Sequence, residues 1–526
     1  MANALAFAAK GDALRLRLFF TFALIFLLSA CGGHDIDDEA NAPTPIPIEE
    51  VPKEGDEGFA GEDSFAVSPI IPGYFIDLDI DPASRTVTGV QRISLHNTTG
   101  FLLDRVFFNL PLNAFSIDYP GVPFFAAHEN RIFHQGIDFG EMVIQMATVN
   151  LSPVEFSTEH TLLTVYFDES LPPGTTTEIA LAFEATIPRI SHRTGGNDYA
   201  MWFGNFLPTL AVLDGGYWHF YPYYPAGHPF FTASANFNVT ITAPVEFTIV
   251  ATGLAIRTEG DETAETSFEV PLVRDFAFAL LSDAYASRRI LTDGGVDIAI
   301  YYHEDTVRAQ DIDAILNTAR AAFEHFSARI GVLPYDTLAL VETELFLRGS
   351  IKYPGMIFVD SRQMRAVGVH QAITRDIGHQ WFYNVVGHNP VTEPWLTLGL
   401  ASFLQLGFTM DDDEISDFAG RLHTSLTEAF NYLQSPELSR DLSYYQSWQD
   451  FQNVQQERGM LLFYALWQKM GTDAFDEFLR AFYQRYAFSI ATSQGMMALV
   501  EEVHGGPLDD FFRDWINSPT LPPLRN

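Results

Sequence analysis

Hydrophobic positions divide the chain into a first part with strand-like patterns and a second part with helix-like patterns. From about residue 70 to 291, apolar residues alternate with polar ones or form short runs, as in 74–80, 86–97 and 160–168. Gly, Pro, Asn and Asp separate these runs, which is typical of strands joined by turns. We therefore expect antiparallel sheets arranged as a sandwich or saddle.

Beyond about residue 300, apolar residues recur at the spacing that places them on one face of a helix. Five of them in the segment 306–331 predict a helix packed on the core: Ile312, Ile315, Ala319, Ala322 and Phe323. The segment 337–360 is interpreted as two strands around a Gly/Pro turn. Further helices are predicted over 374–386, 395–405, 414–433, 459–471 and 473–487. The whole pattern predicts an α+β chain of two domains, β-rich first and mostly helical second.

The N-terminus has the pattern of a targeting segment. Three basic residues precede an apolar run at 18–30, which as a helix would span only about 20 Å, short of the roughly 30 Å core of a bilayer. The run ends in Leu-Ser-Ala-Cys, which resembles the bacterial lipobox. Cys31 is the only cysteine, so it forms no disulfide within the chain. We predict a lipoprotein signal peptide at 1–30 and lipidation of Cys31; a cleaved but unlipidated signal and an uncleaved anchor are the alternatives.

Composition changes this picture in two ways. The segment 31–68 is rich in Gly, Pro and acidic residues, and we predict that it is a disordered acidic tether. The chain carries 30 Lys+Arg against 67 Asp+Glu, a formal net charge of −37. Such a chain repels phosphate backbones, which argues against a nucleic-acid partner. The expected location is extracytoplasmic, with a lipid anchor in a bacterial membrane.

Four segments of the second part resemble one known family. They are 352–358 (KYPGMIF), 379–387 (HQWFYNVVG), 393–396 (EPWL) and 399–404 (GLASFL). Together with 214–225 (DGGYWHFYPYYP) and the strands after it, they are similar to the gluzincin aminopeptidases, thermolysin-like zinc peptidases related to membrane alanyl aminopeptidase. The resemblance covers roughly 69–519. It implies a β-rich N-terminal domain at 69–291 and a thermolysin-like catalytic-type domain at 292–526.

The family resemblance also implies six chemical groups. Two histidines in an H-E-x-x-H helix and a glutamate nineteen residues later bind zinc, and the intervening glutamate acts as the base. A further glutamate binds the substrate amine, and a tyrosine stabilises the oxyanion. In this chain the metal positions are Arg375, His379 and Leu398, the base position is Asp376, the amine-anchor position is Lys352 and the oxyanion position is Gln456.

These residues differ from the family pattern at five of the six positions. Arg375 has no lone pair to donate, and Leu398 cannot bind a metal. At 4 Å and an effective dielectric near 20, the repulsion between two unit positive charges is about 4 kcal/mol. The repulsion between a cation at this position and a bound dication would be about twice that. We therefore expect no zinc cofactor and no metal-dependent hydrolysis. The predicted function is a non-catalytic homologue that binds a peptide or protein partner; a working zinc aminopeptidase or a rebuilt hydrolase is the alternative.

A rebuilt metal site would need other ligands. His370, His379 and His388 are nine residues apart, so they cannot converge from one helix, although a loop after Val386 could return His388. We favour polar surface or interface positions for these histidines. No nucleophile elbow, phosphate-binding loop or dinucleotide-binding fingerprint is present in the sequence.

Two other features bear on the predicted cleft. Arg375 and Lys352 would make its floor positive, so it could bind an anionic group such as a peptide carboxylate. The favoured interpretation is that Arg375 pairs with an acid, either Asp376 or Glu393, because buried charges are usually paired. The aromatic stretch 216–231 is interpreted as a packed loop between domains, with a substrate platform as the alternative.

Overall fold

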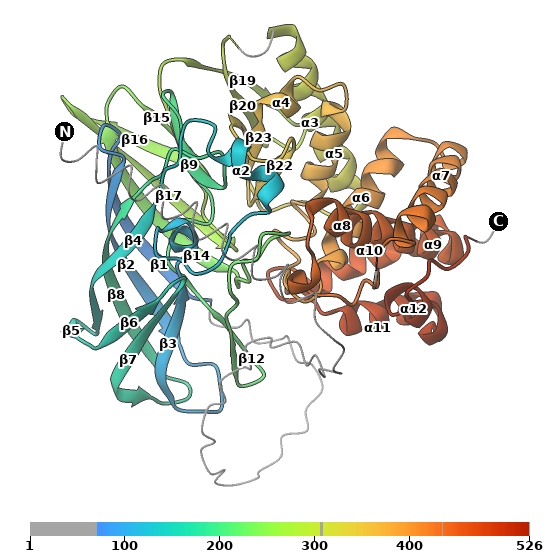
Figure 1. Cartoon of the computed structure of the whole chain (residues 1–526), viewed down its shortest axis with the longest axis horizontal. Coiled ribbons are helices and arrows are strands. Elements are labelled where there is room, and N and C mark those ends of the chain that lie inside the picture. Colours follow the sequence, from blue (N-terminus) through green and yellow to red (C-terminus); the bar gives the residue numbers. More distant parts are fainter. Residues whose placement is uncertain (1–70, 306–308, 434, 525–526) are drawn as a thin grey trace, which may run out of the picture.

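The computed structural model describes residues 71–305, 309–433 and 435–524. The predicted signal peptide, the tether and Cys31 lie outside the described residues. Strands dominate the chain as far as β20 (Asp297–His303), and helices dominate after β23 (Met356–Asp360) (Figure 1). This order of a β-rich part followed by a mostly helical part confirms the predicted α+β fold class.

The largest sheet has eight strands in the order β16-β17-β14-β1-β2-β8-β4-β5. Burial alternates along β1 and β2, so one face of the sheet packs on the core. Neighbouring strands are antiparallel except β1 and β14, which pair in parallel. The strands are β1 (Gly73–Asp81), β2 (Thr86–His96), β4 (Glu141–Val149), β5 (Ser152–Pro153), β8 (Thr176–Thr186), β14 (Ala235–Pro244), β16 (Ala255–Glu259) and β17 (Thr263–Val273).

Three smaller sheets complete the β-rich part, in the orders β15-β18-β10-β9, β11-β3-β7-β6 and β12-β13. Their strands are β3 (Leu103–Asn109), β6 (Phe156–Glu159), β7 (Leu162–Leu171), β9 (Thr194–Gly196), β10 (Ala200–Phe203), β11 (Thr209–Leu210), β12 (Val212–Asp214), β13 (Tyr217–His219), β15 (Thr248–Ala251) and β18 (Phe278–Leu281). Short helical turns lie between them: η1 (Pro111–Phe115), η2 (Ala126–His128) and α2 (Glu129–Ile132).

A five-stranded sheet in the order β19-β20-β21-β23-β22 begins the second part. Its strands are β19 (Tyr285–Leu291), β20 (Asp297–His303), β21 (Thr337–Thr343), β22 (Ser350–Tyr353) and β23 (Met356–Asp360). The prediction of two strands over 337–360 was wrong, because the stretch forms three. The residues between β21 and β22 belong to no strand, and β21 pairs with β23 instead of β22. The Gly/Pro turn joins only β22 to β23, with Gly355 at φ +64°.

Two helices of the second part were predicted with different success. Helix α3 (Ala309–Arg329) confirms the amphipathic prediction, because all five expected core residues are buried. Helix α5 (Val369–Gly378) ends eight residues before the predicted 386. Beyond it the chain forms tight turns, in which the Asn384 amide donates to the His379 carbonyl. Tyr383 has φ 111°, a conformation outside any helix.

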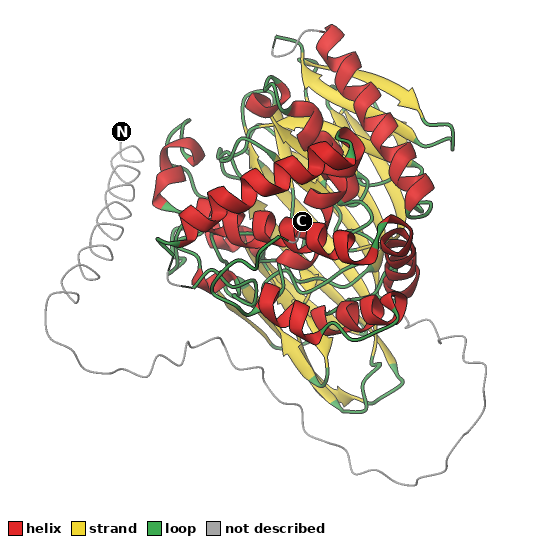
Figure 2. Ribbon diagram, turned by 90° about the vertical axis from the view of Figure 1, so that its right-hand side faces the viewer, coloured by secondary structure: helices red, strands yellow, loops and turns green. Residues whose placement is uncertain are grey.

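The remaining helices lie in front of the strands in the view of Figure 2. They are α4 (Ser361–Met364), α6 (Trp395–Thr409), α7 (Asp412–Phe430), η3 (Leu442–Tyr444), α8 (Trp448–Phe451), the π-helical η4 (Gln452–Arg458), α9 (Gly459–Met470), α10 (Thr472–Tyr486), α11 (Ser493–His504) and α12 (Asp509–Ile516). Among the described residues, no helix has the length and apolarity needed to cross a membrane.

Helix α6 approaches η4 and α9 through a pair of glycines. A Cβ atom at Gly399 would lie 2.5 Å from the carbonyl carbon of Gly459, closer than real Cβ atoms come. Only glycine at position 399 permits this separation of the two backbones. The contact holds α6 against η4, the two helical elements that carry Leu398 and Gln456.

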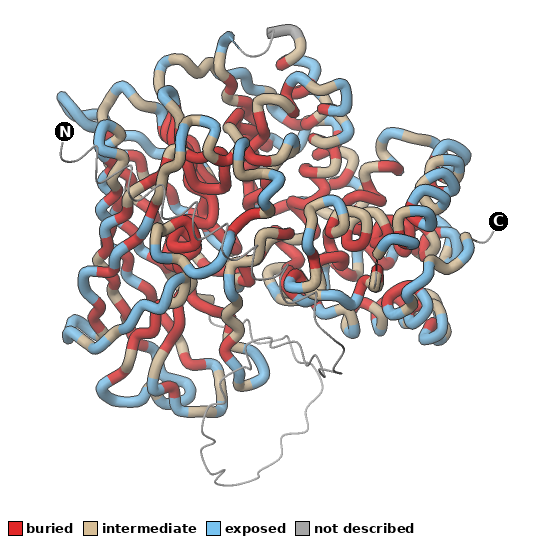
Figure 3. The backbone as a smooth tube through the Cα atoms, viewed as in Figure 1, coloured by how far each residue is buried: buried red, intermediate tan, exposed pale blue. Residues whose placement is uncertain are grey.

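Arg274 joins the β-rich part to the helical part. Its guanidinium donates to the Thr232 carbonyl at 3.2 Å on one side, and to the carbonyls of Val385 (3.2 Å) and Ser489 on the other. Burial lowers the pKa of Arg274 to about 10. We refer to these contacts as the Arg274 junction; Arg274 itself is buried. Buried backbone, red in Figure 3, occurs in both the β-rich and the helical part.

Candidate functional site

The structure brings five of the six family positions to one cavity of about 170 Å³. Lys352 comes from β22, Arg375 and His379 from the end of α5, Leu398 from α6 and Gln456 from η4. The sixth, Asp376, is fully buried next to this cavity and contacts two of these side chains. We refer to this cavity as the cleft.

Asp376 lies in a cluster of charges at the base of the cleft. Its Oδ1 is 3.5 Å from the Lys352 Nζ and 3.7 Å from the Arg375 Nε. The Ser350 hydroxyl donates a hydrogen bond to the other carboxylate oxygen. The expected pairing of Arg375 with Asp376 is therefore present. The other acid considered, Glu393, instead accepts a hydrogen bond from the Ser493 amide at 3.0 Å.

Burial controls the protonation of Lys352. Its side chain is 10% exposed, and desolvation, opposed by the negative charge of Asp376, lowers the pKa of Lys352 to about 8. The positive charge of Arg375 lowers this pKa further. At neutral pH the amine is still mainly protonated, so the position that binds a substrate ammonium in the family holds a cation here.

His379 has the orientation of a metal ligand. Its Nδ1 lies 3.2 Å from the Phe382 carbonyl oxygen, which requires Nδ1 to carry the proton and leaves a lone pair on Nε2. That Nε2 atom is buried and has no hydrogen-bond partner among the described residues. Burial first, and then the charges of Lys352 and Arg375, hold the pKa of His379 well below its usual range. The imidazole is therefore neutral.

The other two metal positions do not match a zinc site. Arg375 is a cation, and the partly buried Leu398 packs against the hydrophobic core. The three positions supply one donor, the Nε2 of His379, whereas tightly held zinc requires three or four. Among residues 71–305, 309–433 and 435–524, no three His, Cys, Asp or Glu side chains are grouped so that they could hold a metal ion. The residues present do not fit the family's metal.

The other two histidines, His388 and His370, lie in different surroundings. His388 is buried, and like His379 it lines a second cavity of only about 10 Å³, so the turn after Val386 does return it towards α5. Burial lowers the pKa of His388 to about 3. A surface position was therefore wrong for these two buried residues, which line this cavity together with His228 of the β-rich part. His370 lies apart and shares a 2.8 Å hydrogen bond with the Thr318 hydroxyl.

One wall of the cleft comes from the β-rich part. The aromatic stretch 216–231 packs between the two parts, since the Tyr221 hydroxyl accepts a 2.7 Å hydrogen bond from Asn389. Near the end of the stretch, Gly227 and His228 line the cleft. Arg193 fixes this wall: it contacts the His228 Nδ1 at 3.1 Å and donates to the Gly227 carbonyl at 2.8 Å.

Sequence reasoning missed both Arg193 and His228 as site residues. Arg193 lies more than 150 residues before the cleft residues of the helical part and belongs to no motif. The only available signal was the dense aromatic composition around His228. That composition marked the stretch 216–231 but no individual residue.

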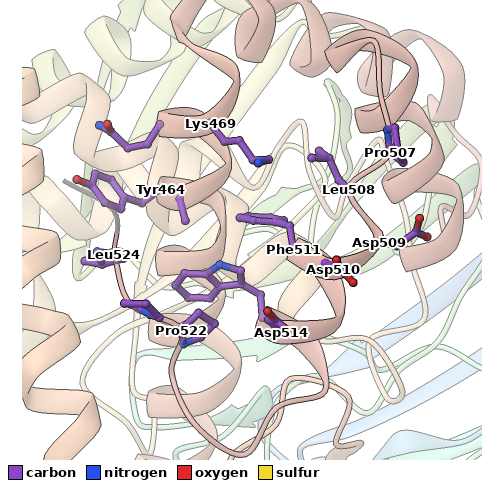
Figure 4. A pocket seen from close by; sticks show the side chains of 14 residues that line it. Tyr464, Lys469, Pro507, Leu508, Asp509, Asp510, Phe511, Asp514, Pro522 and Leu524 are labelled. Atoms are coloured by element: carbon purple, nitrogen blue, oxygen red, sulfur yellow. The ribbon is translucent and has the colours of Figure 1, made fainter.

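A larger cavity, of about 780 Å³, lies on the helical part away from these positions (Figure 4). Tyr464 and Lys469 of α9 and Phe511 of α12 line it together with the C-terminal segment near Leu524. It shares no residue with the cleft, and the six family positions lie elsewhere. We therefore place the candidate site in the cleft.

Comparison with known proteins identifies relatives of the chain. Residues 316–515 match the family model described as the peptidase family M1 domain. The rice (Oryza sativa subsp. japonica) aminopeptidase M1-A is 21% identical over 404 residues, covering 72% of this chain and 44% of the relative. Aminopeptidase N of Streptomyces lividans is 21% identical over 314 residues, covering 55% and 36% respectively. The chain thus spans less than half the length of these curated relatives.

The fold has counterparts among solved structures. The M1 zinc metallopeptidase from Deinococcus radiodurans superposes with a TM-score of 0.63 at 18% identity, covering 87% of this chain and 95% of that protein. A point mutant of the same metallopeptidase gives a TM-score of 0.64. The matched domain contains the end of α5, α6 and η4, the elements that form most of the cleft. Residues 316–515 thus match a peptidase family M1 domain, and the chain is similar to the gluzincin aminopeptidases of that family.

Proposed function

We propose that this protein is a membrane-anchored extracytoplasmic lipoprotein in which the M1 fold serves as a non-catalytic module that binds a peptide or protein partner. One observation carries the non-catalytic part. Asp376, at the base position, is fully buried and paired with Lys352 and Arg375, which stand at the amine-anchor and first-ligand positions.

This charge cluster opposes each step that the family chemistry requires. A general base must reach the proton that it abstracts, directly or through one water. The Asp376 carboxylate instead accepts from Ser350 and faces two cations. Lys352 repels the free ammonium group of an aminopeptidase substrate. Nothing in this arrangement activates a water molecule, and its two cations oppose a bound dication.

The alternative is an active zinc aminopeptidase, and His379 is the observation that favours it. Its neutral imidazole and unpartnered Nε2 are what a zinc ligand requires. A single imidazole is insufficient for tight binding, so we place this function second.

Zinc content and activity of the purified protein decide between the two functions. We expect well under one zinc ion per chain by elemental analysis and no turnover of aminoacyl-p-nitroanilides. An M1 aminopeptidase with an intact H-E-x-x-H motif, purified identically, serves as the positive control. Near-stoichiometric zinc together with turnover would refute the non-catalytic proposal.

A further inference from the structure

We propose that the cleft binds a peptide carboxylate next to an apolar side chain. This inference rests on the proposed function, because a zinc ion in the same cleft would change both its charge and its free volume. It also adds to that function, since it specifies the chemical group that the module recognises and the residues that contact it.

The charge of the cleft is the first observation. Four cationic side chains line it, namely Arg193, Arg348, Lys352 and Arg375, and no Asp or Glu does. Asp376 lies buried against two of them, and these four cations and this one carboxylate together carry a net charge of +3. This positive cleft lies in a chain with a formal charge of −37. A cleft of one charge sign concentrates ligands of the opposite sign.

The second observation is that two of these cations have free donors. Arg348 is exposed and has no ion pair or hydrogen bond with any residue that the structure describes. The closest contact of Arg375 with Asp376 is through Nε, at 3.7 Å, and the Arg375 side chain is 26% exposed. Its terminal guanidinium nitrogens remain available within the described part of the chain. Two parallel N–H donors of an arginine match the two oxygens of a carboxylate.

A buried acceptor belongs to the same space. The Nε2 atom of His379, which lines the cleft, has a lone pair but no partner among the described residues. A buried acceptor without a protein partner can be satisfied by a bound water or ligand. A ligand N–H, such as the amide of a terminal residue, would satisfy this atom.

The walls and volume of the cleft define the rest of the ligand. Apolar and aromatic side chains line the cleft together with the cations: Phe346, Leu347, Leu398, Trp448 and Phe451. The volume of about 170 Å³ is below the roughly 300–1,000 Å³ of pockets for drug-sized ligands. The cleft therefore admits one residue and its carboxylate, and a peptide C-terminus with an apolar last residue fits this description.

Three short peptides test the inference on the full chain by calorimetry. The first is N-acetyl-Ala-Ala-Phe with a free C-terminal carboxylate, the second is the same peptide as its amide, and the third is N-acetyl-Ala-Asp-Phe amide. We expect the free acid to bind at least tenfold more tightly than its amide, and this preference to shrink at high salt. Binding of the Asp-containing amide would identify a side-chain carboxylate as the source of the anion.

Two variants connect binding to the named residues. Arg375→Gln and Arg348→Gln are each expected to weaken binding of the acid peptide about tenfold. Arg348 is exposed and unpaired among the described residues, so its replacement tests binding without disturbing the buried charges. Lys469→Gln, which makes the same charge change in the separate cavity of Figure 4, is the matched control and should leave affinity unchanged.

The outcomes separate this inference from the proposed function. Equal binding of acid and amide, unchanged affinity in both arginine variants, or no binding of any peptide would each overturn the carboxylate assignment. If the protein also lacks zinc and turnover, the non-catalytic proposal would stand. Stoichiometric zinc with turnover would overturn that proposal, whatever the peptides show.

Discussion

Asp376 is the residue on which the charge balance of the cleft depends. It is the only acid paired with Lys352 and Arg375 among the described residues, and it is fully buried. Removing one member of a buried ion pair leaves the other charge without compensation, which typically costs about 3–5 kcal/mol. The altered positions therefore depend on one another for stability.

The variant Asp376→Asn tests this dependence. We expect it to destabilise the protein by about 3 kcal/mol, measured as a shift in the unfolding midpoint. The double variant Lys352→Met/Asp376→Asn should lose less than the sum of the two single variants, because the second change removes the uncompensated cation. Strictly additive losses would show that the two side chains are not coupled.

The lowered pKa of Lys352 predicts how stability depends on pH. The amine loses its proton near pH 8 in the folded protein but near its ordinary value of 10.5 in the unfolded chain. Between these values the unfolded chain binds more protons, so this residue makes folding more favourable as pH rises from about 8 to 10.5. The contribution is lost again as pH falls through about 8.

Thermal unfolding at about pH 8, 9 and 10 measures this contribution. The difference in midpoint between the natural protein and Lys352→Met should change in favour of the natural protein across this range. Lys469→Met, at a lysine outside the cleft, should show a constant difference. Parallel profiles for the two variants would contradict the lowered pKa.

Restoring ligands tests whether the scaffold retains the geometry of a metal site. Arg375→His and Leu398→Glu together should create zinc affinity, since they add two donors beside the oriented His379. Competition with a chromogenic chelator measures this affinity, and each single variant is the control. If the double variant binds no zinc, the backbone at this position has diverged along with the side chains.

Sequence motifs identified much of the cleft, but they could not predict which residues distant in the chain also line it. The local motifs placed Arg375, His379 and Leu398 in order, and the structure brings them to one cavity. Their proposed roles remain predictions. Arg193 and His228 reach the same cavity from loops distant in the chain, and no spacing rule connects residues so far apart.

At the scale of elements, the close approach of α6 to α9 makes a strong prediction. Gly399→Ala would place a Cβ atom 2.5 Å from the Gly459 backbone, and forcing the helices apart is expected to cost about 1–3 kcal/mol. The measurement is the unfolding midpoint of the purified variant.

The matched control for this change is Gly420→Ala on α7. Gly420 is exposed, and an added Cβ there meets nothing within 4 Å. Alanine in an exposed helix interior should stabilise the protein by about 0.5–1 kcal/mol. Opposite signs are therefore expected for the two substitutions, and a stabilising Gly399→Ala would refute the packing argument.

Periodicity predicted the elements better than their ends. Helix α3 has a regular apolar face, so its pattern was unambiguous. The apolar pattern did not indicate that α5 ends early. Trp381, Phe382 and Val386 continue the apolar sequence, although they pack as a buried turn. Apolar residues in a buried turn and in a buried helix give similar patterns.

At the scale of the whole molecule, the order of a β-rich and a helical part was predictable, but one strand pairing was not. Parallel strands require a long connection, and the chain between β1 and β14 contains the strands β2 to β13. Their pairing depends on the assembled sheet, whereas the antiparallel pair β1 and β2 follows from a short turn.

The proposed anchor also belongs to this scale. Cys31→Ser should move the protein from the membrane fraction to the soluble extracytoplasmic fraction and abolish incorporation of labelled fatty acid. Immunoblots of fractionated cells measure the first effect, and the peptide preference of the cleft should be unchanged. Retention of the variant in the membrane fraction would contradict lipidation as the means of attachment.

The Arg274 junction has a consequence for how any ligand is received. It ties Thr232 of the β-rich part to Val385 and Ser489 of the helical part, so the two parts that supply the walls of the cleft hold a fixed relative position. The entropy of arranging those walls is lost during folding and is not lost again on association. A ligand therefore binds a preorganised cleft. Its binding free energy reflects the contacts in the cleft and includes no cost of closing the two parts around it.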